Sequence, residues 1–240
     1  MNHFELEKLR EASGLFNKLL GMLNDYLVRT VEPGRPGSQG EEDKILQELL
    51  PGNGRYVDFG AARPRNNSNT WTFYERGWRG LLVEPNTSFL YMLNYRRPGD
   101  KVYPVAVRNY KGQTPFHIRG EVSSVISSWT ESEPHRIDVD SLAVCERTDE
   151  LLAKFPEDRD QCRFCSIDVE GAERELLETI DWSTFQPEVF CIEYRRYDPV
   201  KLGEDMSGEW KGLLEAQGYK EVARTALNII CKRDENATEA

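Results

Sequence analysis

The chain has 240 residues, of which 39% are hydrophobic and 30% are charged, and these proportions are those of a folded domain rather than of a disordered chain. Its formal net charge is −10 and its Lys and Arg residues are spread along the chain, so we expect no nucleic acid partner. No run of 18 apolar residues and no cleavable leader is visible, so we expect no membrane partner and a cytoplasmic location.

The N-terminal region is expected to be separate from the main fold. Leucines at helical spacing predict an amphipathic helix over residues 4–28. This helix could cover the sheet, line a substrate entrance or pair with a second subunit in a homodimer, and packing on its own domain is the simplest of these. Glu32–Gly37 contains two prolines and two glycines and predicts a hinge, so residues 1–37 form an N-terminal helical extension.

The main domain is predicted to span residues 38–232, in which strands alternate with helices. Ser38, with Glu41 or Glu42, has the pattern of a capping box before the helical run Ile45–Leu50. Apolar runs and turn residues then predict the strands Arg55–Gly60, Gly80–Glu84 and Lys101–Val107 and the helices Ser68–Arg76, with Ser68 as its cap, and Thr87–Tyr95. Such alternation is typical of an α/β domain with a parallel sheet.

The regular alternation stops at residues 108–162, which we interpret as an insertion between strands three and four, over the sheet edge or the active site. It contains the strand-like runs Thr114–Ile118 and Arg136–Val139 and a Ser-rich segment, Ser123–Ser132. The alternation then resumes with the strands Arg163–Asp168 and Glu188–Glu193, the helices Glu173–Ile180 and Gly208–Gln217, and a terminal strand pair, Tyr219–Ala223 and Asn228–Lys232. Residues 233–240 predict a disordered tail.

Three predicted strands each end in an acid near a turn. These acids are Asp58, Glu84 and Asp168. Because the carboxyl ends of parallel strands meet at one edge of a sheet, where ligands bind, we expect the three acids to share one ligand.

The turn after strand one limits what that ligand can be. A pyrophosphate cofactor requires several glycines there, and only Gly60 is present, which excludes a nicotinamide dehydrogenase. S-adenosylmethionine has no phosphate, and one tight glycine turn can admit its amino-acid end, with Asp58 organising the loop or meeting the ammonium. Glu84 is the expected partner of the ribose hydroxyls. Val105 and Ala106 could flank the adenine.

The combination of these motifs resembles the FkbM family of S-adenosylmethionine-dependent methyltransferases. The matching residues are Ser38-Gln39 with Glu42-Asp43, Tyr56-Val57-Asp58-Phe59-Gly60-Ala61 with Ser68-Asn69-Thr70, Glu75 and Gly77-Trp78-Arg79-Gly80 leading to Glu84-Pro85, Ala106-Val107, and Ser166-Ile167-Asp168-Val169-Glu170-Gly171-Ala172-Glu173. The resemblance extends from about Ser38 to Glu193.

The resemblance implies a Rossmann-like seven-stranded class I methyltransferase fold and O-methylation of a hydroxyl on a sugar, glycan or natural product. The matched positions Gln39, Ala61, Asn69 and Pro85 would then join the cofactor site. The chain departs from many family members at Ala62-Arg63-Pro64-Arg65, which replaces an Asp-Gly pair; these arginines could favour an acidic substrate or be solvated loop charges. A second class of function, a methyltransferase-fold binding module without catalysis, remains an alternative, against which the intact acids argue.

Methyl transfer to oxygen requires removal of the hydroxyl proton. Asp168 is the first candidate, as general base or as an anchor for the acceptor, and Glu193 at the tip of strand five could share the acceptor site. His135 and His117, both in the insertion, are the other candidate bases. Glu170 and Glu173, which adjoin Asp168, are interpreted as caps of the following helix or as partners of its positive end.

Metal and thiol chemistry are less favoured. Asp168 and Glu193 could together hold Mg²⁺, but the sequence shows no further ligands, so we predict no metal site. Cys162-Arg163-Phe164-Cys165 is half of a zinc or redox motif and has no second pair, so the five cysteines are expected to be buried or reduced thiols.

Overall fold

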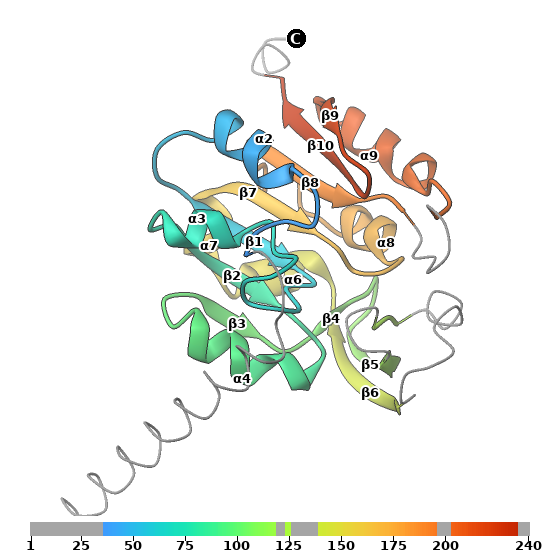
Figure 1. Cartoon of the computed structure of the whole chain (residues 1–240). Coiled ribbons are helices and arrows are strands. Elements are labelled where there is room, and N and C mark those ends of the chain that lie inside the picture. The colour runs from blue at the N-terminus through green and yellow to red at the C-terminus, as the bar shows by residue number, and fades with distance from the viewer. Residues whose placement is uncertain (1–35, 119–122, 126–138, 196–202, 235–240) are drawn as a thin grey trace, which may run out of the picture. The chain divides into compact units, whose positions relative to one another are not determined.

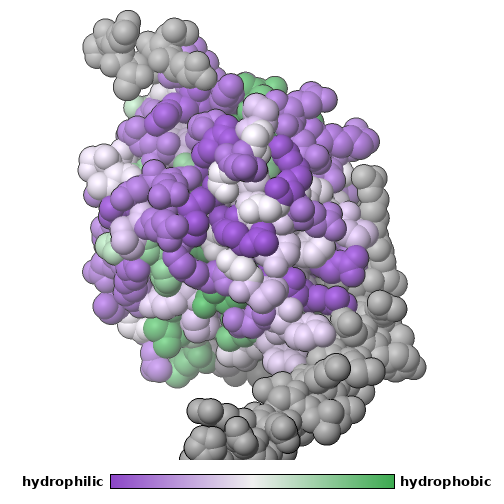
Figure 2. Space-filling view, turned by 90° about the vertical axis from the view of Figure 1, so that its left-hand side faces the viewer, coloured by the Kyte–Doolittle hydropathy of each residue, from purple (hydrophilic) through white to green (hydrophobic). Residues whose placement is uncertain are grey.

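The structure is a computed structural model that describes residues 36–118, 123–125, 139–195 and 203–234. The predictions for the helix over residues 4–28, for most of the Ser-rich segment, for His135 and for the tail beyond residue 234 lie outside these described residues. Within the described ranges, no helix is long and apolar enough to cross a membrane. On the face shown in Figure 2, hydrophilic residues predominate and hydrophobic residues occupy small separate areas.

A seven-stranded, mostly parallel sheet forms the centre of the fold (Figure 1). Its strands are β1 (Arg55–Phe59), β2 (Arg79–Val83), β3 (Lys101–Tyr103), β7 (Cys162–Ile167), β8 (Val189–Glu193), β9 (Tyr219–Arg224) and β10 (Asn228–Arg233). They lie in the order β3-β2-β1-β7-β8-β10-β9, and β10 runs antiparallel to both of its neighbours while the other pairs are parallel. The predicted seven-stranded Rossmann-like α/β fold is therefore confirmed.

Helices cover both faces of the sheet because successive side chains of a strand point to opposite faces. On one face, Tyr56 of β1 packs in a cluster with Leu46 and Phe73, from α2 (Glu42–Leu49) and α3 (Trp71–Glu75). On the other face, Val57 packs in a cluster with Leu176 of α8 (Glu173–Glu178). The remaining helical elements are α4 (Thr87–Arg96), α6 (Thr148–Ala153), α7 (Pro156–Asp160), α9 (Lys211–Glu215) and the 3-10 helix η1 (Ser207–Glu209). The central strands β1, β2, β7 and β8 are buried on both faces, as their apolar runs require, whereas the edge strands β3 and β9 are partly exposed.

The predicted third strand, Lys101–Val107, is wrong as a single element. β3 ends at Tyr103, and β4 (Ala106–Val107) pairs instead with β6 (Val139–Glu146), which also pairs with β5 (Gly112–Ile118) in a second, three-stranded sheet. Pro104 lies at the break and has no N–H for a sheet ladder. The end of the predicted insertion is helical, because α6 and α7 lie between β6 and β7.

The predicted cap of α3 is wrong. The helix begins at Trp71, and its N-cap position is Thr70, which makes no side-chain cap. The Ser68 hydroxyl instead lies 3.3 Å from the Thr70 hydroxyl and accepts a hydrogen bond from Arg97 at 3.4 Å. Both hydroxyls are used to hold a buried polar network, which is described below, and are not free to cap the helix.

The predicted capping box before α2 does not form either. The Ser38 hydroxyl accepts from the backbone N–H of Asp43 at 3.1 Å and donates to its carboxylate at 3.0 Å. Glu42 is buried, and its carboxylate accepts hydrogen bonds from Thr225 and from Asn228, the latter at 3.1 Å. Glu42 therefore joins α2 to the turn between β9 and β10, and its other carboxylate oxygen accepts from the Gly40 N–H at 2.9 Å in the turn before the helix.

The tips of three neighbouring strands are tied together at Gly60. Its backbone N–H donates to the Val83 carbonyl at 2.9 Å, and the Asp168 N–H donates to the Phe59 carbonyl at 2.9 Å. Gly60 has a φ of +81°, and a Cβ atom there would lie 1.7 Å from the Asp168 carbonyl oxygen. Only glycine permits this approach, so this position fixes how closely the ends of β1 and β7 meet.

We expect Gly60→Ala to destabilise the fold by at least about 3 kcal/mol, because the new methyl group overlaps backbone that cannot move independently. Gly52→Ala is the matched control: Gly52 has a φ of +77° but nothing within 4 Å of the added Cβ, so only the cost of the left-handed conformation, about 1–2 kcal/mol, is expected. Urea denaturation of both variants measures the difference. Equal losses in the two variants would contradict the close packing of these strand tips.

Candidate active site

Four acids lie at the carboxyl edge of four adjacent strands. Glu84 follows β2, Asp58 lies in β1, Asp168 follows β7 and Glu193 ends β8, and these strands are neighbours in the order β2-β1-β7-β8. The structure therefore brings the predicted site acids to one edge of the sheet. Gly60 lies among them, where the chain leaves β1.

Glu84 holds two loops of this edge. One of its carboxylate oxygens accepts from the backbone N–H of Ala62 at 2.8 Å, and the other accepts from the N–H of Asn86 at 2.6 Å. Burial raises the pKa of Glu84 to about 7, against the lowering effect of these two hydrogen bonds. Each oxygen accepts one N–H and retains a second lone pair, so the carboxylate can still accept from a hydroxyl group of a ligand.

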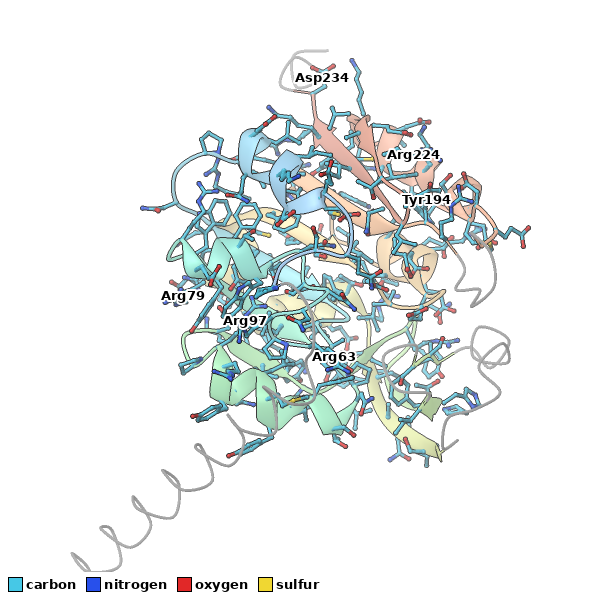
Figure 3. The ribbon with its side chains drawn as sticks, viewed as in Figure 1. Arg63, Arg79, Arg97, Tyr194, Arg224 and Asp234 are labelled. Atoms are coloured by element: carbon cyan, nitrogen blue, oxygen red, sulfur yellow. The ribbon has the colours of Figure 1, made fainter. Side chains whose placement is uncertain are left out.

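Asp58 is supported by a buried network that the sequence did not reveal. Its carboxylate accepts from the Thr70 hydroxyl at 2.5 Å, and that hydroxyl in turn accepts from Arg97 at 2.9 Å. Arg97 has no exposed surface and also contacts the Tyr56 hydroxyl and the Asp100 carboxylate, each at 2.7 Å. Figure 3 shows Arg97 between α3 and α4. Burial raises the pKa of Asp58, and the charge of Arg97 and the Thr70 hydrogen bond oppose the rise.

The polar positions expected at the cofactor site differ in their contacts. Asn69 lies in the loop after β1, and its side-chain amide donates to the Ser166 hydroxyl of β7 at 3.2 Å. Gln39 is exposed. Its segment is nevertheless held beside that same loop, because the Gly37 N–H donates to the Arg65 carbonyl at 2.9 Å. Asn69 is therefore fixed between two strand tips, whereas Gln39 is placed near them through its backbone.

The apolar positions expected at the cofactor site lie mostly in the core. Ala61, Val105 and Ala106 are each at most 5% exposed, and Pro85 is partly buried. Val105 packs with residues of the main sheet, whereas Ala106 belongs to a smaller cluster formed with the second sheet. The two residues therefore mark the boundary between the sheets, beside the tip of β2.

Asp168, Glu193 and Glu170 form a group that we call the acid cluster. One carboxylate oxygen from each lies within 4.8 Å of the others. Burial raises the pKa of Asp168 to about 6 and holds the pKa values of Glu170 and Glu193 well above the usual range, with the neighbouring carboxylates raising the latter two further. Asp168 and Glu193 thus share one site, whereas the expected capping role of Glu170 is wrong, because its side chain faces these two acids.

Glu173 stabilises the turn that carries the acid cluster. Its carboxylate accepts from the backbone N–H groups of Val169 and Gly171, at 3.2 and 3.1 Å. Glu170 has a φ of +52° in this turn, a conformation that is uncommon for residues other than glycine. Burial raises the pKa of Glu173 to about 7. Glu173 therefore serves the turn before α8, close to its expected role at this helix end.

The insertion reaches the acid cluster through a short serine segment. The Ser124 hydroxyl donates to the Glu170 carbonyl at 2.6 Å, and the backbones of Ser124 and His117 exchange hydrogen bonds of 2.8 and 3.1 Å. The side-chain amide of Asn86 lies 3.5 Å from the Ser123 hydroxyl. Part of the predicted insertion therefore contacts the loops at the carboxyl edge. The serines themselves carried no sequence signal beyond the Ser-rich composition.

The segment after Glu193 is fixed by an aromatic ring between two arginines. The guanidinium carbons of Arg195 and Arg224 lie 4.8 and 4.7 Å from the centre of the Tyr194 ring. Arg224 also pairs with Asp205 at 2.9 Å, and Figure 3 shows Arg224 beside Tyr194. These contacts hold the chain where it leaves the tip of β8.

A surface cleft lies at the opposite edge of the sheet, where β7 and β8 begin. Its lining includes Arg159, Arg163 and Glu188. Arg163 pairs with Glu188, and Arg159 with Asp160, so these charges are already balanced within the chain. The carboxyl edge, with its excess of acids, remains the stronger candidate for the site.

The chain is similar to known methyltransferases. The model of the methyltransferase FkbM domain matches residues 58–221, more than half of the chain. No curated protein matches. Among solved structures, a TehB-like SAM-dependent methyltransferase from Corynebacterium glutamicum ATCC 13032 Kitasato is 7% identical, covers 89% of this chain and 96% of its own, and has a TM-score of 0.45. A precorrin-6y C5,15-methyltransferase from Geobacter metallireducens GS-15 is 11% identical, with 80% and 86% covered and a TM-score of 0.41.

The family match begins at Asp58, at the tip of β1, and it includes Glu84, Asp168 and Glu193 at the tips of the neighbouring strands. On this match, the chain belongs to the FkbM family of methyltransferases.

Proposed function

We propose that this methyltransferase transfers the methyl group of S-adenosylmethionine to a hydroxyl of a sugar, glycan or natural-product small molecule. The observation that carries the proposal is the row of acids at one sheet edge, in which Asp168 keeps a buried carboxylate oxygen, Oδ1, without a hydrogen-bond partner. An unpartnered buried acceptor is costly unless a ligand supplies the missing donor, and a hydroxyl is such a donor.

The residues present fit the methyl donor. S-adenosylmethionine carries a sulfonium, an ammonium and a ribose diol, and the acids Asp58, Glu84 and Asp168 offer carboxylates for positive charge and for hydroxyl groups. When bound, it supplies an electrophilic methyl group. We assign the ribose to Glu84 and the amino-acid end to the turn at Gly60 and Ala61, with Asp58 beside it.

Further positions complete the proposed donor site. Val105, Ala106 and Pro85 are assigned to the adenine, because they form the apolar boundary beside the tip of β2. Asn69 and Gln39 belong to the two segments that adjoin the turn after β1. Both are polar side chains that can hydrogen-bond to the donor's polar ends.

The acceptor is assigned to the side of Asp168 that faces Glu193 and Glu170. In our proposal the acceptor oxygen forms a bond to the methyl carbon while the Asp168 carboxylate takes the hydroxyl proton, and Glu193 holds the acceptor in place. Ser124 bonds the Glu170 carbonyl and Ser123 lies beside Asn86, so these serines flank the proposed acceptor position. Acids around the acceptor suit a hydroxyl, which donates a hydrogen bond, better than an anionic group.

The other parts of the proposal rest on composition and thiol state. All five cysteines are free and buried, which suits a reducing compartment, and we propose the cytoplasm as its location. We propose a small-molecule or glycan partner, with no nucleic acid and no membrane, and a homodimer through the N-terminal region remains an expectation. The alternative of a binding module without catalysis would be favoured by donor binding without turnover.

We expect Glu84→Gln to weaken binding of S-adenosylhomocysteine by about tenfold or more at about pH 8, because the amide offers one acceptor oxygen instead of two. The wild-type affinity should fall about tenfold from about pH 8 to about pH 6, because Glu84, with a pKa of about 7, loses its charge over this range. Isothermal titration across pH measures both effects. The affinity of the variant should not depend on pH over this range. A pH dependence in the variant equal to that of the wild type would contradict the role of Glu84.

We expect Asp168→Asn to reduce methyl transfer by about 10²–10⁴-fold, because the amide cannot accept the hydroxyl proton, while binding of S-adenosylhomocysteine changes by less than about threefold. The measurement is release of S-adenosylhomocysteine with a hydroxylated acceptor selected on the wild-type enzyme. Asp160→Asn, at the opposite edge of the sheet, is the control and should leave the rate unchanged. Full activity of Asp168→Asn would exclude Asp168 as the base.

A further inference from the structure

The acid cluster lacks the positive charge that such a group requires. Three oxygens, Asp168 Oδ1, Glu170 Oε2 and Glu193 Oε2, are buried, and among the described residues none accepts a hydrogen bond from a group outside the cluster. Within the described residues, none of the three acids forms an ion pair with Lys or Arg. Asp168 and Glu193 lie close enough to share a proton, but Glu170 adds a third carboxylate that one shared proton does not neutralise.

The three acids are also held in place by the backbone. Asp168 is fixed at the tip of β7 by its bond to Phe59, and Glu193 is the last residue of β8, opposite Asn228 of β10. The turn that carries Glu170 is fixed by the carboxylate of Glu173 and by the Ser124 hydroxyl, which bonds the Glu170 carbonyl. The oxygens therefore converge before any ligand binds, which is the arrangement of a preorganised site.

The spacing and the chemistry of these oxygens select the ligand. Two oxygens on opposite sides of Ca²⁺ lie about 4.6–5.2 Å apart, and those around Mg²⁺ lie about 4.2 Å apart or less. The oxygens of the acid cluster lie within 4.8 Å of one another, which fits the Ca²⁺ spacing directly and requires a small contraction for Mg²⁺. Carboxylates are hard ligands that favour Mg²⁺, Mn²⁺ and Ca²⁺ over softer metals. When all three acids are ionised, a single ammonium group leaves two of the three negative charges unbalanced, whereas a divalent cation leaves one.

We propose that Asp168, Glu170 and Glu193 bind one hard divalent cation. The sequence pointed to two of these ligands, and the left-handed turn at Glu170 supplies the third. The site adjoins the proposed acceptor position, and a cation there would attract the hydroxyl oxygen of the acceptor and ease loss of its proton. This last consequence rests on the proposed function, whereas cation binding itself does not.

Electron paramagnetic resonance titration of the full chain with Mn²⁺, after treatment with EDTA and without any methyl donor, tests the proposal. We expect one Mn²⁺ per chain, displaced by Mg²⁺ or Ca²⁺. Glu170→Gln and Glu193→Gln should each weaken Mn²⁺ binding by about tenfold or more, because each removes a charged ligand. Glu178→Gln, an exposed acid on α8, is the matched control and should leave the affinity unchanged.

Two further variants or measurements separate the alternatives. Glu84→Gln should lose affinity for S-adenosylhomocysteine but keep Mn²⁺ binding, so failure of the donor site and failure of the cation site are distinguishable. Thermal melting in EDTA tests whether Glu170→Gln folds; Mn²⁺ should raise the melting temperature of the wild type but not of this variant. Three results would each overturn the proposal. The first is no Mn²⁺ binding up to about 10 mM, and the second is Mn²⁺ binding that the Glu170 and Glu193 variants do not weaken. The third is stabilisation of the protein by an alkylammonium salt instead of by Mn²⁺.

Discussion

The close approach of Gly60 to the Asp168 carbonyl is the constraint on which the rest of the site depends. It brings the end of β1 against the end of β7, and the Gly60 N–H at the same time joins β1 to β2 through the Val83 carbonyl. Three strand tips therefore meet at one residue that has no side chain. Asp58, Glu84 and Asp168 each lie within two residues of a residue that makes these backbone contacts. The backbone therefore fixes the spacing of the three acids before any side-chain contact is made.

The carboxyl edge of the sheet around Gly60 carries more acidic than basic side chains. Arg97 supports Asp58 through Thr70, and Glu84 and Glu173 are held by backbone N–H groups rather than by cations. Burial of ionised groups without opposite charge costs stability, and the raised pKa values of Glu84 and Glu173, both about 7, express that cost. Such destabilisation is typical of functional sites, and binding of a cationic methyl donor or a metal ion offsets it.

Much of this architecture follows from local sequence patterns. Short apolar runs that end in an acid gave the strands of Asp58, Glu84 and Asp168, and their alternation with helical segments indicated a parallel sheet. Pro104, inside an apolar run, is the local sign that strand three divides. The predicted caps at Ser38 and Ser68 are wrong because Ser38 bonds Asp43, five residues along the chain, and Ser68 bonds Arg97 from a distant segment.

The remaining parts of the site depend on contacts between distant segments. Arg97 looks like an ordinary charge at a helix end, and only the packing of α4 against β1 turns it into the support of Asp58. Glu170 has the composition of a helix cap, but a left-handed backbone directs it to Asp168 and Glu193. Ser124 reaches Glu170 from 46 residues away in the chain. No local sequence pattern predicts these three sets of contacts.

The most direct test of this account is a crystal structure of the protein with S-adenosylhomocysteine bound. The account predicts the ribose hydroxyls within about 3 Å of the Glu84 carboxylate and the amino-acid end at the turn after Gly60. A nucleoside bound elsewhere, such as the cleft beside Arg163 at the opposite edge of the sheet, would contradict it.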